Sequence, residues 1–365
     1  MINVHSCERH AKLNILKVSL LDDKHICYKF TKETLVEDVF HDVCTSIQLQ
    51  ERDIFGIAIP SDEGWLFIEP SEPLHKIVDT YLTPTVRKSR LGIFFLPTNK
   101  STFPNQSSST SSYPTVYFRI RFYIPIHCLN ERVTQHVYYK QLRKNHIAYN
   151  LFCDSNIYLQ LAAFALQAEV GDAPKMYNRE TITSYFVPEL YYPSKFIELW
   201  DSDELVYHTF IRHSALRNTV AYLAEFHFIR LATKLNSDFN LHMYPLKKYA
   251  QKCRFSVWIG VSPKGFTLYQ QFPDDWIIPT NRIKWNEIER MYYNHHEVTI
   301  CLRSKARRRD FKMNRRLSAR HLFCLITNMH FYQSVAEMFA PHSNGLLEQI
   351  VLGNMNRGLV KLRSS

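Results

Sequence analysis

Apolar residues cover almost every side of one segment near the middle of the chain, residues 156–172, which reads NIYLQLAAFALQAEVGD. A helix on the surface would keep one polar face, so this pattern predicts a helix buried at the centre of a helical bundle. Ser155 stands where an N-cap is expected, and Gly171 permits the left-handed turn that ends many helices. At about four turns, the helix is shorter than the roughly 20 apolar residues that span a bilayer.

Before this helix, the pattern predicts a small mixed domain and then a linker. Alternating apolar residues predict short strands at 13–21, 26–30, 55–59, 65–68 and 91–96. A helix follows the first two strands, because Thr34 and Glu37 have the spacing of a capping box. A hairpin, a helix and further strands form the order of a ubiquitin-like fold. The following segment is too polar and serine-rich to be buried, and indicates a flexible connector.

After the linker, the pattern becomes helical and then returns to strands. A strand at 116–124 leads into predicted helices at 131–145, 203–213 and 215–235. Pro188 and Pro193 interrupt the aromatic tract at 183–196, which follows the central helix and precedes the helix at 203–213, so that tract cannot be one helix. From Arg254 onward, short alternating runs surround the turn at 262–265, and a final helix covers 318–339. These strands and one closing helix predict a pleckstrin-homology-like sandwich.

Composition narrows the possible functions. The 365 residues are 45% apolar, enough for two or three domains. Only 9 residues are glycine, and no P-loop or dinucleotide fingerprint is present. The 8 cysteines are scattered, which indicates reduced thiols in a cytosolic protein, and no signal or transmembrane run occurs, so any membrane contact is expected to be peripheral. The net charge of +11 favours an anionic partner without specifying which.

The motifs YYKQLRKNHIAYNLFCDSNIYLQLAAFALQAEVGD (138–172), IGVSPKGFTLYQ and RIKWNEIERMYY resemble those of FERM domains. The resemblance implies an α+β multidomain protein, the three-lobed FERM cloverleaf. Its lobes would be a ubiquitin-like β-grasp (11–97), an acyl-CoA-binding-protein-like helical bundle (115–245) and a PH/PTB-like β-sandwich with a C-terminal helix (246–340). Residues 98–114 would be the linker, and 341–365 a C-terminal extension.

Within this family, AAFALQAEVG followed by YFVPELYYPS is most similar to the Willin and Expanded branch. That similarity implies a non-catalytic adaptor at the plasma membrane, the cortical cytoskeleton and cell junctions, upstream in Hippo growth control. The implied partners are cytoplasmic tails of membrane or junctional proteins, acidic phospholipids and Hippo-pathway scaffold proteins. The alternative is the regulatory targeting module of a larger signalling enzyme, such as a tyrosine phosphatase.

A basic cluster near the C-terminal helix is the first candidate site. Its members are Arg303, Lys305, Arg307, Arg308, Arg309, Lys312, Arg315, Arg316 and Arg320. Like charges at this density favour an acidic phospholipid surface, although a solvated hairpin is the simpler alternative. Nucleic acid fits less well, because no base-reading motif accompanies the cluster. Ala319 stands where other FERM domains have a lysine, so a lipid site between the first and third lobes transfers poorly.

The resemblance also implies a peptide groove between a strand and the closing helix, where a partner would add a strand to the sheet. Its residues would be Ile288, Met291, Tyr293, Leu322, Ile326 and Met329. Ile288 and Leu322 are the members that most resemble plain core. Met329 is predicted to face the groove, and Leu325 the core.

Motifs for catalysis are incomplete. His127-Cys128 begins like a phosphatase loop, but Thr134 occupies the position of the required arginine. His295-His296-Glu297 lacks the second helical histidine of a zinc protease. We therefore predict no catalysis, no metal and no cofactor.

Overall fold

The computed structural model describes residues 14–339 except 62, 83–112, 176–184, 235–238, 248–255 and 304–307, and the side chains of the closing helix as far as Phe331. The chain divides after Arg119 into two compact units. Within the described residues, no helix combines the length and the apolarity needed to cross a membrane.

The first unit contains a five-stranded sheet in the order β2-β1-β5-β3-β4. Its elements are β1 (Ile15–Ser19), β2 (His25–Lys29), α1 (Val36–Ser46), β3 (Phe55–Ser61), β4 (Gly64–Phe67), α2 (Leu74–Ile77), η2 (Val78–Leu82) and β5 (Thr115–Ile120). The predicted hairpin is confirmed as β1 and β2. The predicted capping box is wrong, because Asp38 Oδ2, not Glu37, accepts from the backbone N–H of Leu35 at 2.8 Å. The strand predicted at 91–96 lies outside the described residues.

Strand β5 changes the boundary between the first two lobes. The sequence pattern assigns it to the helical lobe, but it pairs in parallel with β1, where Val116 lies opposite Val18. Phe118 is 1% exposed, and its ring stacks on Phe55 with 5.2 Å between centroids. The first sheet is therefore completed by a strand that lies beyond the linker.

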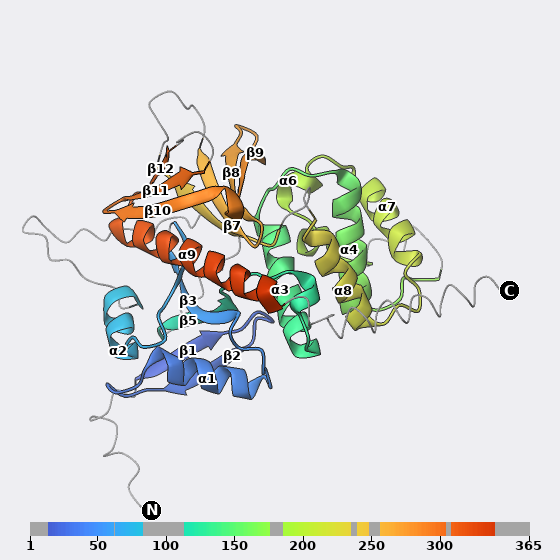
Figure 1. Cartoon of the computed structure of the whole chain (residues 1–365). Helices are drawn as coiled ribbons and strands as arrows, with labels where there is room; N and C mark the ends of the chain where they lie inside the picture. The colour runs from blue at the N-terminus through green and yellow to red at the C-terminus, as the bar shows by residue number, and fades with distance from the viewer. Residues whose placement is uncertain are drawn as a thin grey trace, which may run out of the picture. The chain divides into compact units, whose positions relative to one another are not determined.

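The second unit begins with the helical lobe. Its elements are η3 (Ile126–Cys128), α3 (Arg132–Ala148), α4 (Ser155–Glu169), η4 (Pro188–Leu190), α6 (Ser194–Ile197), α7 (Ser202–Ser214) and α8 (Ala221–Ala232). Helix α4 packs against α7 and α8, which confirms the prediction of a buried central helix (Figure 1). Gly171 has a φ of +92°, as predicted, but the N-cap is Asp154, whose carboxylate accepts from the N–H of Asn156 at 2.7 Å.

The predicted helix at 215–235 is shorter than expected. Residues 215–218 form a turn, and Asn218 has a φ of +66°, which a continuing right-handed helix does not allow. Helix α8 consequently begins only at Ala221.

The C-terminal lobe is built from two sheets and one long helix. The described strands are β6 (His242–Leu246), β7 (Val257–Ser262), β8 (Gly265–Gln271), β9 (Ile277–Lys284), β10 (Ile288–Asn294), β11 (Glu297–Leu302) and β12 (Arg308–Lys312), with η5 (Trp285–Glu287) and α9 (Arg316–Phe339). The sheets have the orders β6-β7-β8-β9 and β10-β11-β12. Strand β6 was not predicted, and it extends this lobe to His242, into the range expected for the helical lobe.

Gly265 is required at the turn between β7 and β8. Its φ is +130°, and a Cβ atom would lie 2.1 Å from the carbonyl oxygen of Ile283. A side chain at this position would separate β8 from β9, so the glycine of the predicted turn serves both the turn and the sheet.

Candidate membrane and peptide surfaces

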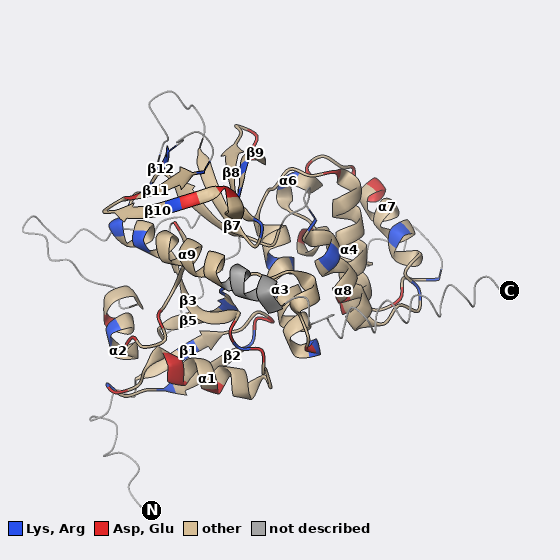
Figure 2. Ribbon diagram, in the orientation of Figure 1, with Lys and Arg blue, Asp and Glu red and all other residues tan. Residues whose placement is uncertain are grey.

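The basic residues lie directly after β11, along β12, and around the start of α9. The described members of this basic surface are Arg303, Arg308, Arg309, Lys312, Arg315, Arg316 and Arg320, whereas Lys305 and Arg307 lie outside the described residues. All seven except Arg309 are exposed. Figure 2 shows basic residues on the first turns of α9, and basic and acidic residues side by side on β10.

The strand part of the basic surface is partly neutralised. Arg308 Nε lies 2.7 Å from Asp310 Oδ1, and the hydroxyl of Thr299 donates to the same oxygen at 2.7 Å. Burial acts to raise the pKa of the Asp310 carboxyl, but these hydrogen bonds keep it below its ordinary value. Asp310 therefore remains charged and offsets one of the arginines.

Arg309 differs from its neighbours. It alternates with Arg308 along β12, so it lies on the same face as Phe311, which is fully buried. Its Nε is buried and makes no hydrogen bond among the described residues. A charge reversal here would disturb the sheet, so Arg309 is a poor position for a test of membrane binding.

The helical part is more open to a partner. Arg315, Arg316 and Arg320 are exposed around the start of α9, and its first turn contains no acidic residue. The positive end of the helix dipole adds to the charge of these arginines. Both would therefore stabilise an anion bound at this position. Ala319, between them, is 0% exposed, so its side chain offers nothing to a ligand.

The expected peptide groove is closed at its helical wall. Leu322, Ile326 and Met329 are each 0% exposed, and Ile288 is 6% exposed. The predicted contrast was also wrong, because Leu325 is 3% exposed and Met329 is no more accessible. All four helical residues point into the sandwich, since they repeat at the spacing of one helix face.

Met291 and Tyr293 of β10 remain partly exposed, and β10 is an edge strand of its sheet in the described structure. Tyr293 stacks on Phe323 of α9 with 6.1 Å between ring centroids. Thr327, one turn beyond Phe323, is exposed. The accessible flank of α9 beside β10 therefore carries Phe323 and Thr327. The sequence-based prediction did not include these two residues, although each directly follows a member of the apolar face, Leu322 or Ile326.

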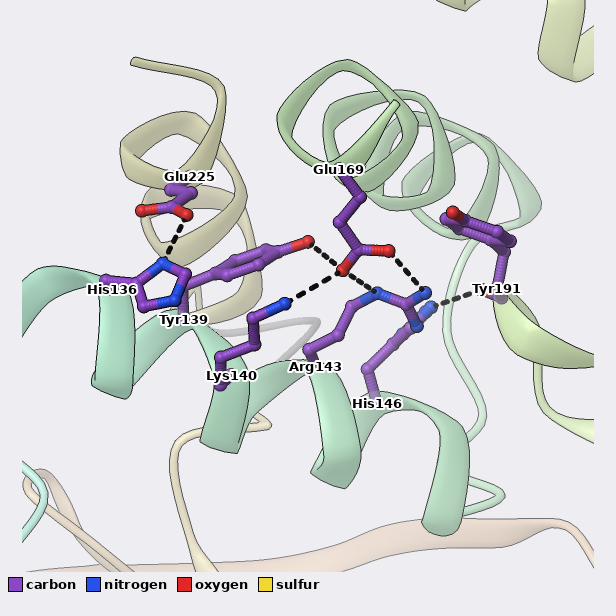
Figure 3. A network of polar contacts seen from close by, with 8 residues as sticks. All are labelled: His136, Tyr139, Lys140, Arg143, His146, Glu169, Tyr191 and Glu225. Atoms are coloured by element: carbon purple, nitrogen blue, oxygen red, sulfur yellow. Dashed lines mark hydrogen bonds and ion pairs between the residues drawn. The ribbon is translucent and has the colours of Figure 1, made fainter. Parts of the chain in front are cut away.

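A network of polar contacts in the helical lobe gives the QLRK and LQAE motifs a structural role and does not form a further site (Figure 3). Arg143 of the QLRK motif in α3 lies 3.4 Å from Glu169 of the LQAE motif in α4, and Tyr139 donates to the same carboxylate at 2.7 Å. Lys140 lies 3.8 Å from it. Burial acts to raise the pKa of Glu169, but Arg143, Tyr139 and Lys140 lower it below its ordinary value. The side chains of these two motifs therefore link α3 to α4.

Comparison with known proteins places the chain in one family. The FERM N-terminal domain matches residues 18–80, the FERM central domain residues 105–244, and the FERM C-terminal PH-like domain residues 251–338. The three models follow one another over most of the chain, so the chain belongs to the FERM-domain family.

Particular relatives are distant. Tyrosine-protein phosphatase non-receptor type 13 of Homo sapiens is 24% identical over 92% of this chain and 12% of that protein. Merlin of Homo sapiens is 23% identical over 72% of this chain and 39% of its own length. In structure, the FERM and C-terminal domain complex of Drosophila Merlin matches with a TM-score of 0.66 at 16% identity, over 90% of this chain and 99% of that one. The chain spans only 12% and 39% of the lengths of the two human proteins.

Proposed function

We propose that the chain is a non-catalytic peripheral adaptor, which binds acidic phospholipids and the cytoplasmic tails of membrane proteins and links them to the cortical cytoskeleton. The observation that carries this proposal is the exposed group Arg315, Arg316 and Arg320 at the start of α9. An anionic leaflet would stabilise these charges by about 1 kcal/mol for each basic group near its surface.

The finer part of the proposal is a place at cell junctions, upstream in Hippo growth control. It is supported by the similarity of AAFALQAEVG and YFVPELYYPS to the Willin and Expanded branch. Depletion of the protein from epithelial cells is expected to change phosphorylation of the pathway's kinases, and unchanged phosphorylation would reject this placement.

A second candidate is the targeting module of a larger signalling enzyme. The similarity to tyrosine-protein phosphatase non-receptor type 13, of which the chain spans 12%, supports it. Sequencing of the full transcript distinguishes the two: a catalytic domain in the same reading frame would favour the targeting module.

The membrane proposal predicts that Arg315→Glu, Arg316→Glu and Arg320→Glu together weaken binding to vesicles of phosphatidylcholine, phosphatidylserine and phosphoinositide. The loss is expected to be about ten- to hundredfold, from about 1 kcal/mol for each charge removed, reduced by salt screening. Thermal melting should change little, because glutamates suit the start of a helix. Co-sedimentation measures the binding.

The matched control reverses three exposed lysines of the first unit, Lys29, Lys32 and Lys76, and so changes the net charge equally. If the control loses as much binding as the α9 variant, only overall charge matters and the proposed surface is wrong.

The proposed peptide surface on the flank of α9 beside β10 gives a separate prediction, a loss of peptide binding. Thr327→Glu adds a charge at an exposed position beside β10, so it should abolish capture by receptor-tail peptides that bind the parent while changing unfolding free energy by no more than about 0.5 kcal/mol. Leu317→Glu is the control, because Leu317 is 40% exposed and lies about 120° around the helix from Phe323. Retained capture by Thr327→Glu would exclude this flank as the binding surface.

A further inference from the structure

The helical and C-terminal lobes of the second unit are joined by backbone hydrogen bonds beside an open pocket. The N–H of Phe152 donates to the carbonyl of Ile277 at 2.9 Å, and the N–H of Ile277 donates to the carbonyl of Asn150 at 2.7 Å. Phe152 also meets Trp276 edge to face, with 5.7 Å between ring centroids. These contacts fix the two walls of the pocket relative to each other.

The pocket has a volume of about 430 Å³ and a largely apolar lining. Phe196 and Trp276 are buried there, whereas Phe152 and Leu199 are 55% and 64% exposed. A pocket of this size accepts one large side chain, and exposed apolar groups around a buried aromatic floor are typical of sites that anchor a partner. The lining therefore supplies affinity for an apolar group.

Charge around the pocket has the opposite sign to that of the chain. The described segments 150–155, 194–201 and 272–278 that form its walls carry Asp154, Glu198, Asp201, Asp274 and Asp275, and their basic residue is Lys195. Lys195 Nζ lies 2.8 Å from Glu198 Oε2, so its charge is already matched. In a chain of net charge +11, this acidic rim selects a cationic partner.

We propose that this pocket docks a peptide in which a bulky apolar residue is flanked by lysine or arginine. The apolar side chain would enter between Phe152 and Leu199 above Trp276, and the flanking cations would face Asp274 and Asp275. The site is separate from the basic surface and from the β10 edge, and its test does not depend on the function proposed for either.

The test is selection of random dodecamer peptides displayed on phage against the full chain, with depletion on a Phe152→Ser, Leu199→Ser variant. Both residues are exposed, so the variant should fold. We expect the selected clones to share a leucine or aromatic residue next to lysine or arginine. A synthetic peptide of the consensus should bind the depletion variant more than about tenfold more weakly than the parent.

A second variant tests the charge alone. Asp274→Asn with Asp275→Asn preserves shape, and asparagine tolerates the φ of +66° found at Asp275. It should weaken the consensus peptide about fivefold at low salt and less at high salt. The control, Tyr207→Ser with Ile211→Ser, removes two exposed apolar side chains of α7 and should leave binding unchanged.

Three results would overturn the proposal. In the first two, selection enriches no clone over the depletion variant, or the enriched clones lack basic residues. A dimer of the chain that dissociates in the Phe152→Ser, Leu199→Ser variant would instead identify a second copy as the occupant.

Discussion

Met329→Glu is expected to unfold the C-terminal lobe, with a loss of about 4 kcal/mol or more in unfolding free energy. Met329 is 0% exposed, so the substitution removes a buried side chain and leaves a carboxylate in its place. A whole domain is stabilised by only about 5–15 kcal/mol, so most of that margin would be lost. Urea unfolding, followed by circular dichroism, measures the change.

Two variants of the same helix calibrate this result. Leu325→Glu should be equally damaging, since Leu325 is 3% exposed, whereas Thr327→Glu should remain close to the parent. A Met329→Glu protein as stable as Thr327→Glu would show that this face opens to solvent, and would restore Met329 to the peptide groove.

The wrong prediction for Met329 shows the limit of what helical periodicity can predict. The spacing of Leu322, Leu325, Ile326 and Met329 correctly predicts one apolar face, but such a face cannot reveal which of its members a partner would touch. That division depends on the width of the sandwich beneath the helix. Helical spacing places Phe323 beside the apolar face, but its contact with Tyr293 of β10 is a tertiary contact that the spacing does not specify.

Two strands were assigned wrongly: β5 was predicted but placed in the helical lobe, and β6 was not predicted as a strand. Strand β5 pairs with β1, which lies about one hundred residues earlier in the chain, and β6 pairs with β7 across a segment outside the described residues. Local alternation indicates a strand but carries no information about its neighbour. By contrast, α4 and the turn at Gly265 were predictable, because burial on all sides and a positive φ leave local signals.

Two buried histidines are the reason for the second large expected effect, a loss of stability on acidification. His146 Nε2 lies 3.1 Å from the carbonyl oxygen of Tyr191 and must donate to it, which leaves Nδ1 deprotonated (Figure 3). This Nδ1 is buried without a hydrogen-bond partner among the described residues. Burial, with the charge of Arg143, lowers the pKa of His146 to about 3, and burial, with Arg121, lowers the pKa of His321 to about 3.

The sign of the pH effect follows from these two histidines. The unfolded chain binds a proton at each below its ordinary pKa of about 6.5, while the folded chain remains unprotonated until about pH 3. The stability that these two histidines contribute is therefore fully present above pH 6.5, and it falls as the pH decreases from 6.5 towards 3. The lowered pKa values of Glu169 and Asp310 act only below their ordinary values near 4, so the interval from pH 6.5 to 5 isolates the histidines.

Acidification from pH 7 to pH 5 is accordingly expected to lower the unfolding free energy of the second unit by about 2 kcal/mol for each of these histidines. Urea unfolding of the whole chain at both values measures the change. His146→Gln should be less stable at pH 7, because the imidazole packs among aromatic rings, but its stability should fall less steeply with pH than that of the parent. Equal slopes in the parent and His146→Gln would mean that His146 is protonated in the folded chain at pH 5, which the burial of the unpartnered Nδ1 and the nearby charge of Arg143 argue against.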